Sequence, residues 1–278
     1  MTKATTPDTG QEMETITSAD GTEIAFERTG SGPPLVLITG GATNDHTRWE
    51  QAGVRPTFAE HCTVYAMDGR GRGESGDADE YALEREVEDV TAVVDAVDGP
   101  VTLLGHSVGA LYPLEAALRT DNLGKLILYE PPIAVGDHEL GVEEVVTEIE
   151  TLLNDGEKEQ ALVLFLQAVG GLSPEELDAL CSAPTWQDRV DVAHIIPRGL
   201  QAADEYEFDA SRFAGLTTPT LLLSGSESPP LYKDGIEALN KALPNSRIVT
   251  FDGHAHVAIL TATDRFIDEV LAFTRESN

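Results

Sequence analysis

A serine between two glycines is the strongest chemical signal in the chain. The segment GHSVG, residues 105–109, follows the apolar run 101–104 and precedes a helix-forming stretch. A strand, a sharp turn and a helix in that order lift a serine hydroxyl clear of a sheet, and the first N–H groups of the helix point at the same spot. The segment therefore predicts a nucleophile at Ser107. The alternative is a serine that only caps the helix, with glycines present for the turn.

A nucleophilic serine needs a base that takes its proton, and imidazole suits this role at neutral pH. Two histidines, His254 and His256, stand together in the stretch FDGHAHVAIL near the end of the sequence. A carboxylate must then hold the histidine in the correct tautomer.

The elements that must position these side chains alternate between apolar strand-like runs and helical patterns. Such runs occur at 33–41, 101–105, 124–132, 219–225 and 246–253, and helical patterns lie between them, for example over 46–60 and 264–275. This alternation predicts an α/β protein with a mostly parallel central sheet and helices on both faces. Asp20-Gly21 predicts a hairpin turn near the N-terminus.

Residues 133–212 interrupt the alternation with several helical segments and no convincing strand. We expect them to form a helical cap inserted into a core made of residues 13–132 and 213–278. The polar residues 1–12 are expected to be disordered.

Four stretches resemble the α/β-hydrolase fold family, and the resemblance extends from about residue 14 to 275: LVLITGG, DGRGRGESG, GHSVG and DGHAHVAILTATDRF. It implies that His256 is the catalytic base, with Ala255 in place of a glycine, and that His254 lies at the pocket rim. It also implies that the N–H groups of Gly41 and Val108 form an oxyanion hole. Thr39 replaces the histidine usual in this family.

The resemblance leaves the acid open between two positions. The family commonly places an Asp four positions into a Gly-x-x-Asp after the strand at 219–224, where this chain has Ser228. Some members carry a Glu after the strand that follows the nucleophile helix, and Glu130 falls there. Glu130 is therefore the predicted acid, and Glu227 is the alternative.

The remaining motifs do not indicate a cofactor. The segment DGRGRGESGD, residues 68–77, lacks the ending of a phosphate-binding loop and is predicted to be structural, with Asp68 organising its turn. No metal-ligand spacing or dinucleotide fingerprint is found in the sequence. Cys62 and Cys181 are expected to be reduced, buried thiols of an intracellular protein.

The charge of the chain is unusual. Its 49 acidic and 18 basic residues give a net charge of −31, which argues against binding to nucleic acid or to anionic membranes. The excess of carboxylates, together with only five lysines, resembles the composition of proteins from salt-rich cytoplasms. No apolar stretch approaches the length of a membrane span and no secretory signal is found, so a cytoplasmic location is expected.

Together these residues predict a cofactor-free serine hydrolase. Ser107 would attack the carbonyl of a small-molecule ester, or of a related acyl or C–C substrate, that enters beneath the insertion. A perhydrolase or an acyltransferase with the same triad stays open, as does a non-catalytic ligand-binding protein that keeps the fold. The sequence does not indicate an oligomeric state.

The charge generates a first prediction. Below about 0.5 M KCl, self-repulsion between carboxylates is screened too weakly, and we expect the protein to lose fold and activity. Circular dichroism and an ester assay across a KCl series measure this. Full stability in dilute buffer would contradict salt adaptation.

Overall fold

The structure is a computed structural model that describes residues 12–136 and 138–276. Eight strands form one sheet in the order β1-β2-β4-β3-β5-β6-β7-β8. The pairs β1·β2 and β2·β4 are antiparallel, and all the other pairs are parallel. This confirms the predicted fold class. The strands are β1 (Glu12–Thr17), β2 (Glu23–Gly30), β3 (Pro34–Ile38), β4 (Thr63–Met67), β5 (Val101–His106), β6 (Leu123–Tyr129), β7 (Thr220–Gly225) and β8 (Ser246–Phe251).

The N-terminal hairpin forms where the sequence predicted it. β1 and β2 pair on either side of a turn that contains Asp20 and Gly21, and Gly21 has a φ of 92°. The segment expected to be disordered, 1–12, lies outside the described residues except for its last residue, which begins β1.

Helices cover both faces of the sheet because alternate residues of each buried strand point to opposite sides. Leu103 of β5 packs in one hydrophobic cluster and Leu104 in the other. The Leu103 side is covered by α3 (Leu83–Ala96), α4 (Leu111–Ala116) and α10 (Pro230–Ala242), and the Leu104 side by α1 (Thr47–Gln51), α2 (Arg55–Ala59), α11 (Ala258–Thr261) and α12 (Thr263–Arg275). In the part of the chain that the structure describes, no helix combines the length and hydrophobicity needed to cross a bilayer.

The helix predicted over 46–60 is wrong as a single element. Gly53 has a φ of 74°, a left-handed conformation that ends α1. Pro56 then lies in the first turn of α2, where its missing N–H costs nothing. The segment is therefore two short helices with a turn between them.

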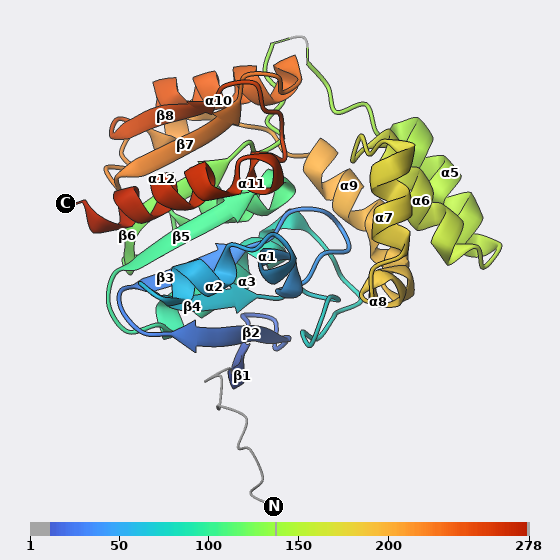
Figure 1. Ribbon diagram of the computed structural model, residues 1–278, viewed down its shortest axis with the longest axis horizontal. Helices are drawn as coiled ribbons and strands as arrows, with labels where there is room; N and C mark the ends of the chain where they lie inside the picture. Colours follow the sequence, from blue (N-terminus) through green and yellow to red (C-terminus); the bar gives the residue numbers. More distant parts are fainter. Residues whose placement is uncertain (1–11, 137, 277–278) are drawn as a thin grey trace, which may run out of the picture.

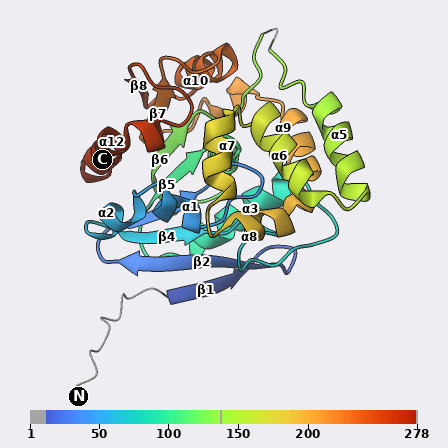
Figure 2. The same ribbon diagram turned by 45° about the vertical axis from the view of Figure 1, so that its right-hand side comes forward.

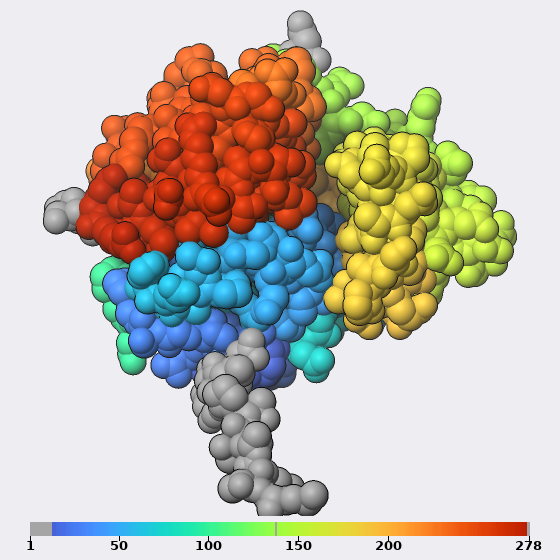
Figure 3. Space-filling view, viewed as in Figure 1, coloured from blue at the N-terminus to red at the C-terminus, as the bar shows by residue number. Residues whose placement is uncertain are grey.

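Between β6 and β7 the chain forms a block of helices with a hydrophobic cluster of its own. This helical insertion consists of α5 (Glu143–Asn154), α6 (Lys158–Ala168), α7 (Pro174–Cys181), α8 (Trp186–Asp191), a 3₁₀ turn (Ala193–Ile195) and α9 (Ile196–Asp204). Figure 1 shows it beyond the end of the sheet toward which β5 points, and Figure 2 shows α5, α6, α7 and α9 grouped together. In the space-filling view it is a separate mass beside the core (Figure 3).

The chain returns from the insertion to the core through a 3₁₀ turn, Ala210–Phe213. Phe213 is buried in the cluster on the Leu103 side of the sheet. The division into core and cap at residues 132 and 213 stays a prediction.

The two cysteines are free but differ in burial. Cys62 is buried, as expected, whereas Cys181 is partly exposed at the end of α7. The expectation that both are buried is wrong for Cys181, because α7 contributes only Leu177 to the buried set of the insertion.

The sheet core generates a second prediction. Leu104 is fully buried in β5, so Leu104→Ala is expected to lower the free energy of unfolding by about 2–5 kcal/mol through lost burial and a cavity. Leu260, 42% exposed, is the matched control, and Leu260→Ala is expected to change stability by about 0.5 kcal/mol or less. Denaturant unfolding in KCl buffer measures both. Equal losses would contradict the described packing.

Candidate active site

Ser107 lies at a strained turn directly after β5. Its φ is 56°, and within the described residues only Glu130, at 45°, is another non-glycine residue with a positive φ. Such a conformation costs about 1–3 kcal/mol and persists only where the surroundings enforce it. A 3₁₀ turn, Ser107–Ala110, then leads into α4. The strand, turn and helix predicted around this serine are therefore present.

The glycines around Ser107 are required by close backbone contacts. A Cβ on Gly105 would lie 2.3 Å from the carbonyl oxygen of Gly109, and a Cβ on Gly109 would lie 2.2 Å from that of Thr39. A Cβ on Gly40 would lie 2.6 Å from the Cβ of Ser107. The loop after β3 therefore packs directly against the serine.

The peptide between Gly40 and Gly41 has a fixed orientation. The Gly40 carbonyl accepts hydrogen bonds from the Asn44 side-chain amide at 2.5 Å and from the Thr39 hydroxyl at 3.2 Å. Because a trans peptide is planar, fixing this carbonyl turns the Gly41 N–H to the opposite side. Thr39, which departs from the family pattern, therefore contributes a hydrogen bond of its own. Asn44 carried no signal in the sequence.

Glu130 and His256 meet at the carboxyl ends of the strands. His256 Nδ1 lies 2.7 Å from one carboxylate oxygen of Glu130. The other oxygen accepts hydrogen bonds from the Ser224 hydroxyl at 2.9 Å and the Gly225 N–H at 2.7 Å. An ionised carboxylate only accepts, so Nδ1 carries the proton and Nε2 is left to face a hydroxyl.

The environment keeps Glu130 ionised although the residue is 0% exposed. Burial, the largest influence, raises the pKa of this carboxyl group. The hydrogen bond from His256, the attraction of its charge and the Gly225 N–H outweigh burial and hold the pKa below its ordinary value.

The alternative residues lie elsewhere. The Glu227 carboxylate is exposed and accepts a hydrogen bond from the Ser226 hydroxyl at 3.0 Å. His254 pairs through Nδ1 with the Thr261 hydroxyl at 2.9 Å. The structure thus brings Glu130, and not Glu227, to His256. The catalytic role of each residue stays a prediction.

Two tyrosines that sequence reasoning missed hold His256 in place. The Tyr129 hydroxyl accepts the Ala258 N–H at 2.8 Å and donates to the Ala255 carbonyl at 2.9 Å, which fixes both sides of the loop. The Tyr232 ring stacks on the imidazole of His256 with centroids 4.1 Å apart. The position of Tyr129 beside Glu130 could have been noticed, whereas Tyr232 had no signal.

His106 links the serine turn to the His256 loop. Its Nε2 donates to the His256 carbonyl at 3.0 Å. Burial and the neighbouring His256 lower the pKa of His106 to about 3, so it is neutral and keeps this bond. No hydrogen bond joins the Ser107 hydroxyl to His256 in the described part of the chain. Such contacts are often long in a free enzyme and tighten when substrate binds.

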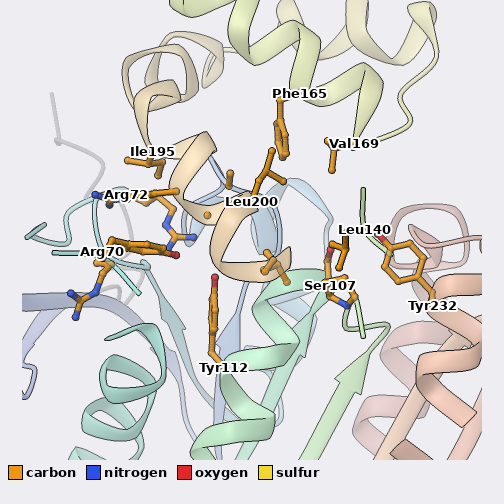
Figure 4. Close-up of a pocket in the computed structure, with 18 residues that line it drawn as sticks. Arg70, Arg72, Ser107, Tyr112, Leu140, Phe165, Val169, Ile195, Leu200 and Tyr232 are labelled. Carbon is orange, nitrogen blue, oxygen red and sulfur yellow. The ribbon is translucent and has the colours of Figure 1, made fainter. Parts of the chain in front are cut away.

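Ser107 opens into a cavity between the sheet and the helical insertion. It contains about 640 Å³ of empty space, part of it open to solvent, and Gly41 and Val108 line it together with Ser107. Figure 4 shows Ser107 and Tyr232 at one end and Phe165 and Leu200 of the insertion above. The two residues predicted to supply the oxyanion N–H groups therefore line the same space as the predicted nucleophile.

The structure brings together three potential metal ligands that their spacing in the sequence did not predict. Asp45, His46 and Asp68 place ligand atoms within 4.8 Å of one another. Asp68 already accepts the His46 backbone N–H at 2.7 Å, its ring Nδ1–H at 2.8 Å and the Glu74 N–H at 3.0 Å. Burial lowers the pKa of His46, but the bond to Asp68 outweighs it and raises the pKa. This ion pair explains the cluster, and Asp68 organises its loop as predicted.

The chain is similar to several known proteins. A model of the alpha/beta hydrolase family matches residues 35–269. An alpha/beta hydrolase from Sphaerobacter thermophilus of known crystal structure is 34% identical, with 94% of this chain and all of that chain covered and a TM-score of 0.79. A pimeloyl-[acyl-carrier protein] methyl ester esterase from Aeromonas hydrophila is 27% identical over 90% of this chain and 98% of its own length.

A 2-hydroxy-6-oxo-6-(2'-aminophenyl)hexa-2,4-dienoic acid hydrolase from Metapseudomonas resinovorans is 28% identical. That similarity spans 52% of this chain and about half, 55%, of the relative.

The Glu130 environment generates a third prediction. A carboxylate with a lowered pKa stabilises the fold above its ordinary value of 4.5, and this contribution is lost as pH falls through the lower, folded value. Glu130→Gln removes it, so wild type is expected to lose more stability than the variant between pH 6 and pH 3, roughly. Denaturant unfolding across this range measures the difference.

Glu227→Gln is the matched control, because Glu227 follows the neighbouring strand β7 but is exposed. Its pH profile is expected to follow wild type. Parallel profiles for wild type and Glu130→Gln would contradict the charge state described for Glu130.

Proposed function

The chain belongs to the alpha/beta hydrolase family, and on that premise we propose that it is a serine hydrolase that cleaves carboxylic esters through an acyl-enzyme intermediate. The observation that carries the proposal is the 2.7 Å contact between His256 Nδ1 and the buried Glu130 carboxylate, beside a strained serine that opens into a cavity. The name of the Aeromonas relative, a methyl ester esterase, agrees with an ester substrate.

The first step is acylation. Nε2 of His256 takes the proton of the Ser107 hydroxyl as Oγ attacks the ester carbonyl. The negative charge that develops on the carbonyl oxygen is stabilised by the N–H groups of Gly41 and Val108. One such preorganised donor contributes about 3 kcal/mol to the transition state. His256 then gives the proton to the leaving alcohol oxygen as the C–O bond breaks.

The second step is hydrolysis of the acyl-enzyme. His256 takes a proton from water, the water oxygen attacks the acyl carbon, and the proton returns to Ser107 Oγ as the acid is released. Glu130 orients the imidazole and stabilises its positive charge in both steps. Because Tyr129 and His106 hold the loop of His256, the ring needs little reorganisation.

The helical insertion closes the substrate site. Leu140, Phe165 and Leu200 contribute apolar surface to the cavity that contains Ser107. We therefore assign the acyl part of a small-molecule ester to this space, beneath the insertion, which acts as a cap.

The same enzyme is proposed to work in a salt-rich cytoplasm. The solvent face of α5 illustrates the reason, since Glu143, Glu144, Glu148 and Glu150 are exposed there and the helix has no basic residue. Glutamates at i and i+4, such as Glu144 and Glu148, repel each other, and concentrated salt screens this repulsion.

The triad generates a fourth prediction, measured as hydrolysis of p-nitrophenyl butyrate in ~2 M KCl to screen the acidic surface. Ser107→Ala is expected to abolish turnover, because it removes the nucleophile. Glu130→Gln is expected to lower kcat by about 10⁴-fold, because the wrong tautomer of His256 then faces the serine. Glu227→Gln, the matched control, is expected to keep wild-type activity.

Labelling by a fluorophosphonate probe supplies an independent measurement. Wild type is expected to be labelled, and Ser107→Ala is not. A folded wild-type protein that neither reacts with the probe nor hydrolyses the ester would overturn the proposal in favour of a ligand-binding protein.

A further inference from the structure

Two arginines at the border between the core and the helical insertion have no carboxylate partner. Arg48 belongs to α1 of the core and Arg189 to α8 of the insertion. Neither forms an ion pair in the part of the chain that the structure describes, whereas the buried Arg55, Arg70 and Arg72 each do. In a chain with a net charge of −31, two arginines without a counter-charge need an explanation.

Contacts across this border bring the two arginines to the same place. The Gln51 side-chain amide donates to the Thr185 hydroxyl, directly before α8, at 3.3 Å. Arg48 lies three residues before Gln51, and Arg189 lies four residues after Thr185. Residues three or four apart share one face of a helix, so both arginines lie beside this contact. Figure 2 shows α8 next to α1.

Arg189 also contacts the loop after β3. Its Nε donates to the Thr43 hydroxyl at 3.1 Å, and Thr43 is buried. The next residue, Asn44, holds the Gly40 carbonyl through its side-chain amide. The Arg189 guanidinium therefore connects the insertion with the loop that is predicted to supply an oxyanion donor.

The remaining N–H groups of both arginines are available to a ligand. Arg189 is 9% exposed, and within the described residues only its Nε makes a hydrogen bond. Its Nη1 and Nη2 are not among the unpartnered atoms that are sealed from solvent, so both keep accessible surface. The same holds for the three guanidinium nitrogens of Arg48, whose side chain is partly buried.

The two positive charges are not compensated by their surroundings. Burial, and after it the charge of Arg48, lower the pKa of Arg189 to about 10, and burial also lowers the pKa of Arg48. Both therefore stay charged at neutral pH. Asp45 attracts Arg189 but forms no ion pair with it among the described residues, and its carboxylate accepts the Thr47 N–H at 2.9 Å. Partly buried charges of like sign are costly unless a counter-charge pairs with them.

We propose that a small anion of single charge binds between Arg48 and Arg189 and holds the insertion against the loop after β3. Guanidinium groups with free N–H donors suit chloride or a carboxylate group. The anion thus comes either from the medium, as chloride, or from the ester, as a carboxylate on the substrate or its acid product. The inference goes beyond the proposed esterase function, because anion binding is measured without turnover.

The test measures chloride binding to the full-length protein as broadening of the chloride NMR signal in ~1 M KCl, which also screens the acidic surface. Arg48→Met and Arg189→Met are each expected to lower the broadening about twofold or more, because one guanidinium attracts the anion with half the charge. Arg247→Met, which removes one arginine of an exposed ion pair with Glu276, is the matched control and should broaden the signal as wild type does. Circular dichroism checks that every variant is folded.

Formate, a small carboxylate, is the probe for the second source. Its binding is measured through the relaxation of its own proton signal in the same four proteins. A wild-type excess over both arginine variants for chloride alone supports the proposal and assigns the site to an ion of the medium. An excess for formate supports it and extends the site to a carboxylate of the substrate. No excess for either anion, or the same loss in Arg247→Met, would overturn the inference, whatever the result of the ester assay.

Discussion

The contact between His256 and a carboxylate at the end of β6 is the interaction on which the geometry of the site depends. A buried carboxylate is costly unless its oxygens are hydrogen-bonded. Glu130 obtains its partners from the end of β7 and from the loop after β8. The hydrogen bonds of the Glu130 carboxylate therefore connect the ends of β6 and β7 with the loop after β8, and they fix the position of the His256 imidazole. The positive φ of Glu130 is part of the cost of this arrangement.

The carboxylate that contacts His256 lies at the end of β6, and the residues around it differ from the common pattern of the family. At the position after β7 where the family commonly has Asp, Ser228 is buried, and its hydroxyl helps to lower the pKa of the Glu130 carboxyl group. The carboxylate stands one strand away, directly after Tyr129, whose hydroxyl holds the histidine loop from both sides. The end of β6 thus supplies both the carboxylate that contacts His256 and the tyrosine that holds the loop of His256.

The glycine-rich loop after β4 packs against two arginines that line the cavity. Asp68 holds the turn through hydrogen bonds to backbone N–H groups, and Gly69 and Gly71 leave space for arginines from the core and from the insertion. Arg198 and apolar side chains of the helical insertion line the same cavity as Ser107.

The sequence alone determined the features that depend on neighbours along the chain. The turn at Ser107, the N-terminal hairpin, the buried strands and the fold class follow from local spacing and apolar patterns. The sequence did not reveal the break at Gly53, because a helical pattern does not show the sign of φ. It left Glu130 and Glu227 open, because both follow strands and only strand order decides which carboxylate reaches His256. It missed the contacts of Tyr232 and Asn44, and the presence of Arg72 and Arg198 in the lining of one cavity. Those contacts join residues distant along the chain, and packing in three dimensions alone brings them together.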